Sequence, residues 1–303
     1  MQKKIFILVA VFSALIVDAQ ILKVDSIERV TIPESEMTEQ VVGISPKGDF
    51  LLLSSQSQEG LVRFDLSKKA ITVISDAPSA GFNARISQDG SKVLFQEMSV
   101  ADEGRVIKHG VKSLDVKKQK VTQLISPTEN FSSLSLSGDV VVGMSAGQKI
   151  DAKTIKGKSA TVKKPVLNND DLKIWLTVDG KTRKIAPQGD DFAYIWESLS
   201  PDMTKILYVN EAGCFVTDLN GMILVNLGEL RAPKWIDDST VVGMLDHDDG
   251  TVVTSSEIVV KTLSGGVQIL TDSSLTGMWP QVAEGKIAFS NPKGEIYIIN
   301  YKK

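Results

Sequence analysis

The chain has 303 residues, of which 34 are lysine or arginine and 37 are aspartate or glutamate, giving a formal net charge of −3. This mild, mixed charge argues against a nucleic-acid-binding surface, for which a basic field is expected. Cys214 is the only cysteine, so an intrachain disulfide is excluded. Its strand-like surroundings are typical of a small buried side chain.

The N-terminal segment has the pattern of a secretory signal peptide. Two lysines precede an apolar run over residues 5–17, and small residues follow it. The run is shorter than the roughly 20 residues that span a bilayer. We therefore expect residues 1–19 to be cleaved before Gln20 and residues 20–303 to form a single domain without a transmembrane segment. The expected location is periplasmic or secreted.

One pattern recurs along the rest of the chain. An apolar strand ends at a short oxygen-bearing side chain, a polar or glycine turn follows, and an alternating strand returns. Such turns are typical of β-hairpins, because the side-chain oxygen can accept hydrogen bonds from backbone N–H groups. The turn residues of the six copies are Asp65, Asp115, Thr177, Asp218, Thr262 and Asn300.

A second turn precedes each of these hairpins and leads into an apolar strand. Its six copies begin at Ser45, Ser87, Ser137, Ser200, Asp237 and Ala283. Two hairpins per repeat make four strands, and a repeat of about 47 residues is close to the length of a propeller blade. The sequence therefore predicts an all-β, six-bladed β-propeller of four-stranded antiparallel blades.

The two ends of the chain indicate how this ring would close. The sixth repeat lacks its outermost strand, whereas residues 28–32 resemble the fourth strand of the first repeat. Pairing of this segment with residues 295–301 would complete the last blade and remove an exposed sheet edge. We expect the N-terminal strand to pair with the C-terminal blade.

The repeat also resembles a known family. The turns at Ser45-Pro46-Lys47-Gly48 and Ser200-Pro201-Asp202, and the hairpin at Phe64-Asp65-Leu66, are similar to the WD40-like (PD40) repeats of TolB-type β-propellers. The resemblance covers nearly all of the chain after the signal peptide. It implies an envelope or periplasmic protein that engages a partner through one face of its ring.

Residues 148–164 depart from the repeat, because they contain six lysines and few large apolar side chains. We expect an insertion between the second and third strands of the third blade, on the same face as the loops at residues 99–110 and 246–251. The candidates for a binding face are Lys149, Lys153, Lys156, Lys158, His109, His247, Trp235 and Trp279. The alternatives are a surface insertion without a role and tryptophans that pack between blades.

Two further motifs suggest chemistry. Residues 143–147 fit the G-x-S-x-G pattern of a nucleophile elbow, but that elbow needs an α/β sheet and a following helix, so we interpret the match as fortuitous. Asp246, Asp248 and Asp249 could bind Ca²⁺, although they also suit a solvated hairpin tip. We assign no catalytic and no cofactor-binding residue, and Ca²⁺ is the only cofactor that the sequence suggests.

The sequence favours a binding protein over an enzyme. The repeats, the signal peptide and the lack of a convincing catalytic set indicate an exported, monomeric protein-binding or scaffolding module of the cell envelope. The alternative is a propeller that binds, or acts on, a carbohydrate or another small ligand in its central channel. Aromatic and acidic residues near the inner strands favour this second hypothesis.

Overall fold

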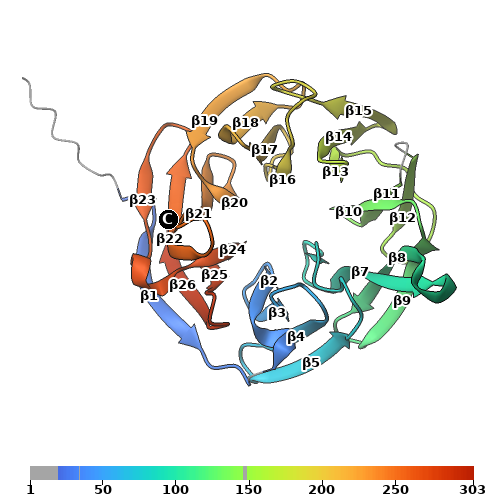
Figure 1. Ribbon diagram of the computed structural model, residues 1–303, viewed down its shortest axis with the longest axis horizontal. Coiled ribbons are helices and arrows are strands. Elements are labelled where there is room, and N and C mark those ends of the chain that lie inside the picture. The colour runs from blue at the N-terminus through green and yellow to red at the C-terminus, as the bar shows by residue number, and fades with distance from the viewer. Residues whose placement is uncertain (1–19, 34, 146–148) are drawn as a thin grey trace, which may run out of the picture.

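The computed structural model describes residues 20–33, 35–145 and 149–303 of the chain. These residues form 26 β-strands and three single-turn 3-10 helices, η1 (Glu36–Thr38), η2 (Asp102–Gly104) and η3 (Ser273–Leu275). The strands make seven antiparallel sheets, which are arranged as blades in a ring (Figure 1). No helix in this described part is long and apolar enough to cross a membrane.

The strands follow one another in chain order from blade to blade. Blades 1 and 2 contain β2 (Gln40–Ile44), β3 (Phe50–Ser54), β4 (Leu61–Asp65) and β5 (Ala70–Ser75), then β6 (Arg85–Ile86), β7 (Lys92–Ala101), β8 (Val106–Asp115) and β9 (Lys120–Thr128). Blades 3 and 4 contain β10 (Phe131–Ser137), β11 (Val140–Ser145) and β12 (Lys149–Thr154), then β13 (Val166–Asp170), β14 (Lys173–Val178) and β15 (Lys181–Ile185).

The last three blades have four strands each. Blades 5 and 6 contain β16 (Ile195–Leu199), β17 (Lys205–Asn210), β18 (Gly213–Asp218) and β19 (Ile223–Gly228), then β20 (Arg231–Asp237), β21 (Thr240–Asp248), β22 (Val253–Thr262) and β23 (Val267–Ile269). Blade 7 contains β24 (Met278–Ala283), β25 (Lys286–Ser290), β26 (Ile296–Lys302) and the N-terminal strand β1 (Lys23–Val30).

The ring has seven blades, so the prediction of six was wrong. Residues 131–185, which we expected to form one blade with an insertion, form the two three-stranded sheets of blades 3 and 4. The expected lysine-rich insertion is in fact the edge strand β12 with the connection that leads to β13. An edge strand needs few apolar side chains, so its polar sequence carries no clear strand signal.

Blade 4 also lacks the first hairpin of the repeat. Ser135 donates a hydrogen bond to the carbonyl of Leu167, and Asn168 donates one to Ser133 at 3.1 Å, so β13 runs antiparallel to β10. β13 contacts both β10 and β16, the innermost strands of the neighbouring blades. β13 is therefore the innermost strand of blade 4, but it runs in the direction that the second strand has in the other blades. Because its own first strand and turn are missing, a count of paired turns merges blades 3 and 4.

The core consists of seven clusters, one at each interface between neighbouring blades. Second strands are buried on both faces, so consecutive side chains pack against opposite neighbours. Leu51 and Leu53 pack against blade 7, whereas Leu52 packs against blade 2. The smallest cluster joins blades 3 and 4, and its buried members are Val142, Val162 and Val166.

The predicted closure of the ring is confirmed. β1 pairs with β26, with Glu28 opposite Ile298 and Val30 opposite Ile296. Leu22, just before β1, is buried between blades 6 and 7, and its backbone N–H donates to Gln268 Oε1 at 2.8 Å. The N-terminal segment therefore ties the last two blades together.

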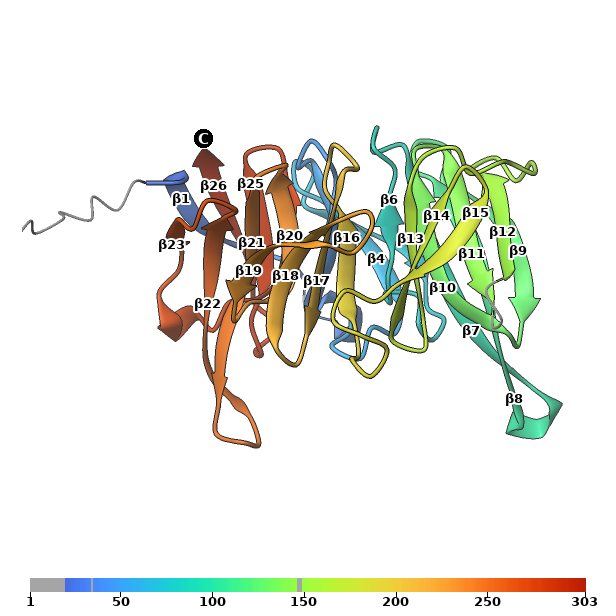
Figure 2. The same cartoon turned by 90° about the horizontal axis from the view of Figure 1, so that it is seen from above.

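The predicted turn chemistry is confirmed for four of the six hairpin residues, namely Asp65, Asp115, Asp218 and Thr262. It was wrong for Thr177, whose hydroxyl pairs with that of Thr182, and for Asn300, which donates to Ser26. Asp65 Oδ1 accepts a hydrogen bond from the backbone N–H of Lys68 at 2.9 Å, and Ser200 Oγ accepts one from that of Lys205 at 3.0 Å. Two hairpins, β7–β8 and β21–β22, project from one face of the ring (Figure 2). The turns between first and second strands lie at the other end of these strands, on the opposite face.

Candidate binding site in the central channel

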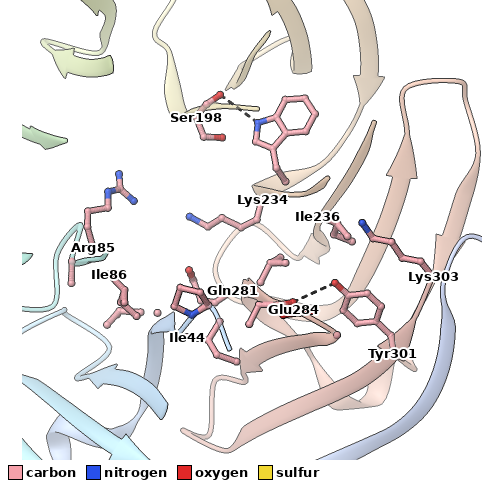
Figure 3. A pocket seen from close by; sticks show the side chains of 18 residues that line it. Ile44, Arg85, Ile86, Ser198, Lys234, Ile236, Gln281, Glu284, Tyr301 and Lys303 are labelled. Carbon is pink, nitrogen blue, oxygen red and sulfur yellow. Dashed lines mark hydrogen bonds between the residues drawn. The ribbon is translucent and has the colours of Figure 1, made fainter. Parts of the chain in front are cut away.

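A cavity of about 800 Å³ lies inside the ring, and its lining includes Pro46, Glu284 and Gly285 from turns on the face opposite the long hairpins. Its walls come from the innermost strands of blades 1, 2, 5, 6 and 7, from the turns that follow some of these strands, and from Tyr301 and Lys303 at the C-terminal end (Figure 3). In each of these five innermost strands, one residue of the wall lies opposite the same position of the second strand. These five residues are therefore structurally equivalent. These equivalent residues are Gly43, Arg85, Ser198, Lys234 and Gln281.

The innermost strands of blades 5, 6 and 7 are irregular just before this position. Trp196, Ala232 and Trp279 have φ values of 52°, 46° and 58°, and each lies within a register shift. A β-bulge re-aims the side chains next to it. A positive φ is uncommon for a residue with a side chain and occurs often near functional sites. An irregularity of the same kind, a register shift that contains a residue with positive φ, therefore precedes Ser198, Lys234 and Gln281.

Three cationic residues line the cavity. Lys303 is paired with Asp237 at 2.8 Å, which leaves Arg85 and Lys234. The guanidinium of Arg85 and the amine of Lys234 point into the same open space from opposite blades (Figure 3). Neither belongs to any of the ion pairs found within residues 20–33, 35–145 and 149–303. Burial, and then the charge of Arg85, lower the pKa of Lys234 to about 8. Burial also lowers the pKa of Arg85.

The carboxyl group of Glu197 is buried, and its charge acts on both Arg85 and Lys234, whereas Glu284, at the edge of the cavity, is exposed. Asn169 Nδ2 donates to Glu197 Oε2 at 3.0 Å and also to the carbonyl of Tyr194 at 3.0 Å. Burial raises the pKa of Glu197, although the hydrogen bond from Asn169 and the charges of Arg85 and Lys234 oppose the shift. Burial therefore weakens the ionised form of Glu197 relative to that of an exposed glutamate.

Ser198 and Trp235 complete the chemistry of the wall. Trp235 Nε1 approaches the carbonyl of Ser198 at 3.4 Å. Ser198 Oγ is buried and has no hydrogen-bond partner within the part of the chain that the structure describes. Ser198 therefore lines the cavity, although its hydroxyl oxygen is itself buried in the wall.

The two tryptophans predicted for a binding face have different positions. Trp235 lines the cavity. Trp279 packs against the core between blades 6 and 7, where its ring meets Trp196 edge to face with 6.0 Å between centroids. The alternative of an interblade packing role therefore describes Trp279, whereas a binding role for Trp235 stays a prediction.

The predicted lysines do not form one face with the long hairpins. Lys149 begins β12, whereas Lys153 lies near its end, where its Nζ donates to the carbonyl of Leu124 at 2.6 Å. Lys156 and Lys158 belong to the turn after β12. The backbone N–H of Ile155 donates to the carbonyl of Asp139 at 2.8 Å, which places this turn on the face opposite the hairpins.

The two histidines lie on different hairpins. His109 lies on β8, half-buried near Phe131, and burial lowers its pKa. His247 is exposed on β21, close to the tip of its hairpin. Neither histidine lines the channel cavity.

The candidate calcium residues are engaged in other contacts. Asp246 Oδ2 forms an ion pair with Arg231 at 2.9 Å, and its side chain is only 3% exposed. Asp248 and Asp249 accept hydrogen bonds from backbone N–H groups of their own turn, at 2.9 Å each from Gly250 and Thr251. No group of three metal-ligating side chains exists among the described residues. These contacts agree with the alternative of a hairpin tip.

The G-x-S-x-G match lies partly on strand β11. Gly143, Met144 and Ser145 belong to that strand, and Ala146 and Gly147 lie outside the described residues. Sequence reasoning missed Arg85, Lys234 and Glu197, which carry the charge of the channel. The sequence did contain one indication of these three residues. Each is a charged residue that stands two or three positions before the turn at the end of the first strand of its blade.

The comparisons with known proteins show the fold. No family model and no curated protein sequence matches the chain. It is similar to a chain in the crystal structure of the Mitotic Checkpoint Complex, at 8% identity and a TM-score of 0.59, with 92% of this chain and 91% of that chain covered. The β-propeller domain of the Trilobed protease from Pyrococcus furiosus is similar at 15% identity and a TM-score of 0.57, with 88% and 97% covered.

A computationally designed protein, Ika8, is similar at 12% identity and a TM-score of 0.51, with 90% of this chain and 100% of that chain covered. Identities this low show the fold alone. The protein is a β-propeller. Its membership of the TolB-type family stays a prediction.

Proposed function

We propose that this protein binds a small anionic ligand in its central channel. The observation that carries the proposal is the pair Arg85 and Lys234, two half-buried cations in one cavity that form no ion pair with a described residue. Charges removed from water are costly, and an anion between Arg85 and Lys234 would add a compensating charge to that of the nearby Glu197. This is the small-ligand hypothesis of the sequence analysis with the ligand charge specified.

The cavity has the dimensions of a small-molecule site. Its volume of about 800 Å³ lies within the usual range for such pockets. Arg85 offers a planar set of donors that suits carboxylate or phosphate. Trp235 supplies an aromatic surface for the ligand body.

The test measures the binding of acetate, phosphate, glucuronate and citrate by thermal unfolding and by calorimetry. At 100 times its dissociation constant, a ligand stabilises the folded state by about 2.7 kcal/mol. We expect the shift in Tm to disappear in Arg85→Met and Lys234→Met. The exposed cations Arg105 and Lys117 provide matched controls, and Arg105→Met and Lys117→Met should keep the shift. Equal shifts in all four variants would refute the channel site.

A second candidate function is binding of a protein partner by the face with the long hairpins. Val100 and Ile107 lie opposite each other near the tip of β7–β8 and are 58% and 52% exposed, and Val252 at the other tip is 59% exposed. Apolar side chains on projecting arms favour contact with another protein. A partner recovered from envelope extract should be lost with the double variant Val100→Asp and Ile107→Asp. Recovery that does not change would argue against this face.

Export of the protein is part of the proposal. The basic and apolar pattern of residues 1–19 supports it. Expression of the full chain in a Gram-negative host, followed by fractionation and mass spectrometry of the N-terminus, should give a periplasmic protein that begins at Gln20. An uncleaved cytoplasmic product would contradict export.

A further inference from the structure

We propose that Lys234 forms a covalent imine with a 2-oxo acid in the central channel. The inference rests on the proposed anion site, because the carboxylate of the 2-oxo acid would occupy that site beside Arg85. It specifies the ligand class as a carboxylate with an adjacent ketone. It also assigns different roles to the two cations of the cavity.

The amine of Lys234 is more available than those of other half-buried lysines. Lys112 Nζ contacts Glu97 at 2.5 Å, and Lys261 Nζ donates to two backbone carbonyls at 2.7 and 2.9 Å. Lys234 Nζ has no such partner among the described residues and faces the open cavity (Figure 3). A lysine that is neither paired nor fully hydrated is suited to attack a carbonyl group.

The electrostatics support the same role. Burial and the neighbouring positive charge of Arg85 lower the pKa of Lys234 to about 8, while Glu197 opposes the shift. A substantial fraction of the amine is then neutral, and the neutral amine is the nucleophile. Arg85 stays the better carboxylate ligand, since a guanidinium binds the two oxygens of a carboxylate together.

The apolar part of the wall indicates the rest of the ligand. Ile86 follows Arg85 in the sequence, and Trp235 and Ile236 follow Lys234. All three of these residues line the cavity. A methyl group would leave much of the 800 Å³ cavity to water. A branched or aromatic side chain would bury more apolar surface against these residues, so we expect such 2-oxo acids to react more readily than pyruvate.

The reaction balances without a cofactor. The nitrogen lone pair of Lys234 adds to the ketone carbon, and the carbon–oxygen bond of the resulting carbinolamine breaks. The oxygen leaves as water with the two hydrogens of the neutral amine, and a carbon–nitrogen double bond remains. Sodium cyanoborohydride, added as the hydride donor, would reduce this imine to a stable secondary amine.

The experiment incubates the full chain at pH 8 with pyruvate, 4-methyl-2-oxopentanoate or phenylpyruvate in the presence of cyanoborohydride. Intact mass and peptide mapping then locate the adduct. We expect one adduct per chain, at Lys234, with the two larger acids ahead of pyruvate. Lys234→Arg should abolish it, Arg85→Met should slow it by about tenfold, and Lys117→Arg should leave it unchanged. Circular dichroism of each variant checks that the ring has folded.

Two results would overturn the inference. One is an adduct spread over many exposed lysines at similar rates, and the other is no adduct at Lys234 in a folded protein. Lactate and phenyllactate have the carboxylate but no ketone, so they can bind at the anion site without forming an imine. They therefore show whether the imine alone fails or whether the proposed anion site fails as well. If they raise Tm in the wild type and not in Arg85→Met, the anion site stands although the imine does not form.

Discussion

Arg29 on β1 forms an ion pair with Glu295, just before β26, with 3.0 Å between Nη2 and Oε1. The two residues lie near opposite ends of the sequence, and their contact is next to the pairing of β1 with β26 that closes the ring. The pair is largely exposed on the Arg29 side, so its own contribution to stability is small. Backbone pairing and the apolar residues next to it account for the closure.

Truncation of Leu22 should therefore destabilise the whole ring. Leu22 is 1% exposed and packs into the core between blades 6 and 7, so Leu22→Ala should lower the free energy of unfolding by about 2–5 kcal/mol. Ile27 on the same N-terminal segment is 38% exposed, and Ile27→Ala should cost clearly less. Urea denaturation measures both. Equal losses would show that the burial of Leu22 does not anchor the strand.

Local unfolding should begin between blades 3 and 4. Among the residues whose burial the structure describes, the cluster there has three buried members, whereas the cluster between blades 6 and 7 has eleven. Regions with few buried apolar contacts open at lower free energy. Hydrogen exchange should therefore be faster for the amides of β12 and β13 than for those of β25 and β26. Slower exchange in β13 than in β25 would contradict this expectation.

Stability should depend on the ionisation of Lys234. Its pKa is about 8 in the folded protein against an ordinary 10.5, so between these pH values the unfolded chain binds more protons. Stability then rises as the pH increases through this window, by at most about 3 kcal/mol. Chemical denaturation of the wild type and Lys234→Met from pH 7 to 10.5 measures the difference. The charged neighbours Arg85 and Glu197 are present in both proteins, so a parallel pH dependence would exclude this role of Lys234.

Metal removal should leave the protein unchanged. Asp246 is paired with Arg231, and Asp249 accepts hydrogen bonds within its own turn, so neither carboxylate is free to bind a cation without losing these contacts. We expect the same Tm with EDTA and with added Ca²⁺. A drop of several degrees with EDTA, restored by Ca²⁺, would revive the calcium hypothesis.

Cys214 should be unreactive in the folded protein. The side chain is buried, as the sequence indicated, and burial raises its pKa to about 12. Because the thiolate is the reactive form, a thiol reagent at pH 8 should modify Cys214 only after denaturation. Rapid labelling of the native chain would show that blade 5 opens on the timescale of the assay.

Much of the fold was readable from local residues. Asp65 and Ser200 accept backbone hydrogen bonds in tight turns, and such contacts depend on a few neighbouring residues. The count of blades failed at β12 and β13, because β12 is a polar edge strand and blade 4 lacks a first hairpin. Apolar patterns identify strands that are buried on both faces, and these two strands do not have that pattern.

The channel site could not be predicted in the same way. Arg85 lies in β6 and Lys234 in β20, the first strands of two different blades, and nothing near either residue in the sequence indicates the other. Closure of the ring brings them to one cavity. Turn residues and the complementary terminal strand were enough to define a closed β-propeller, since hairpins are local. The number of blades and the partners across the channel were decided by packing over long sequence distances, where two side chains meet only after every blade between them is in place.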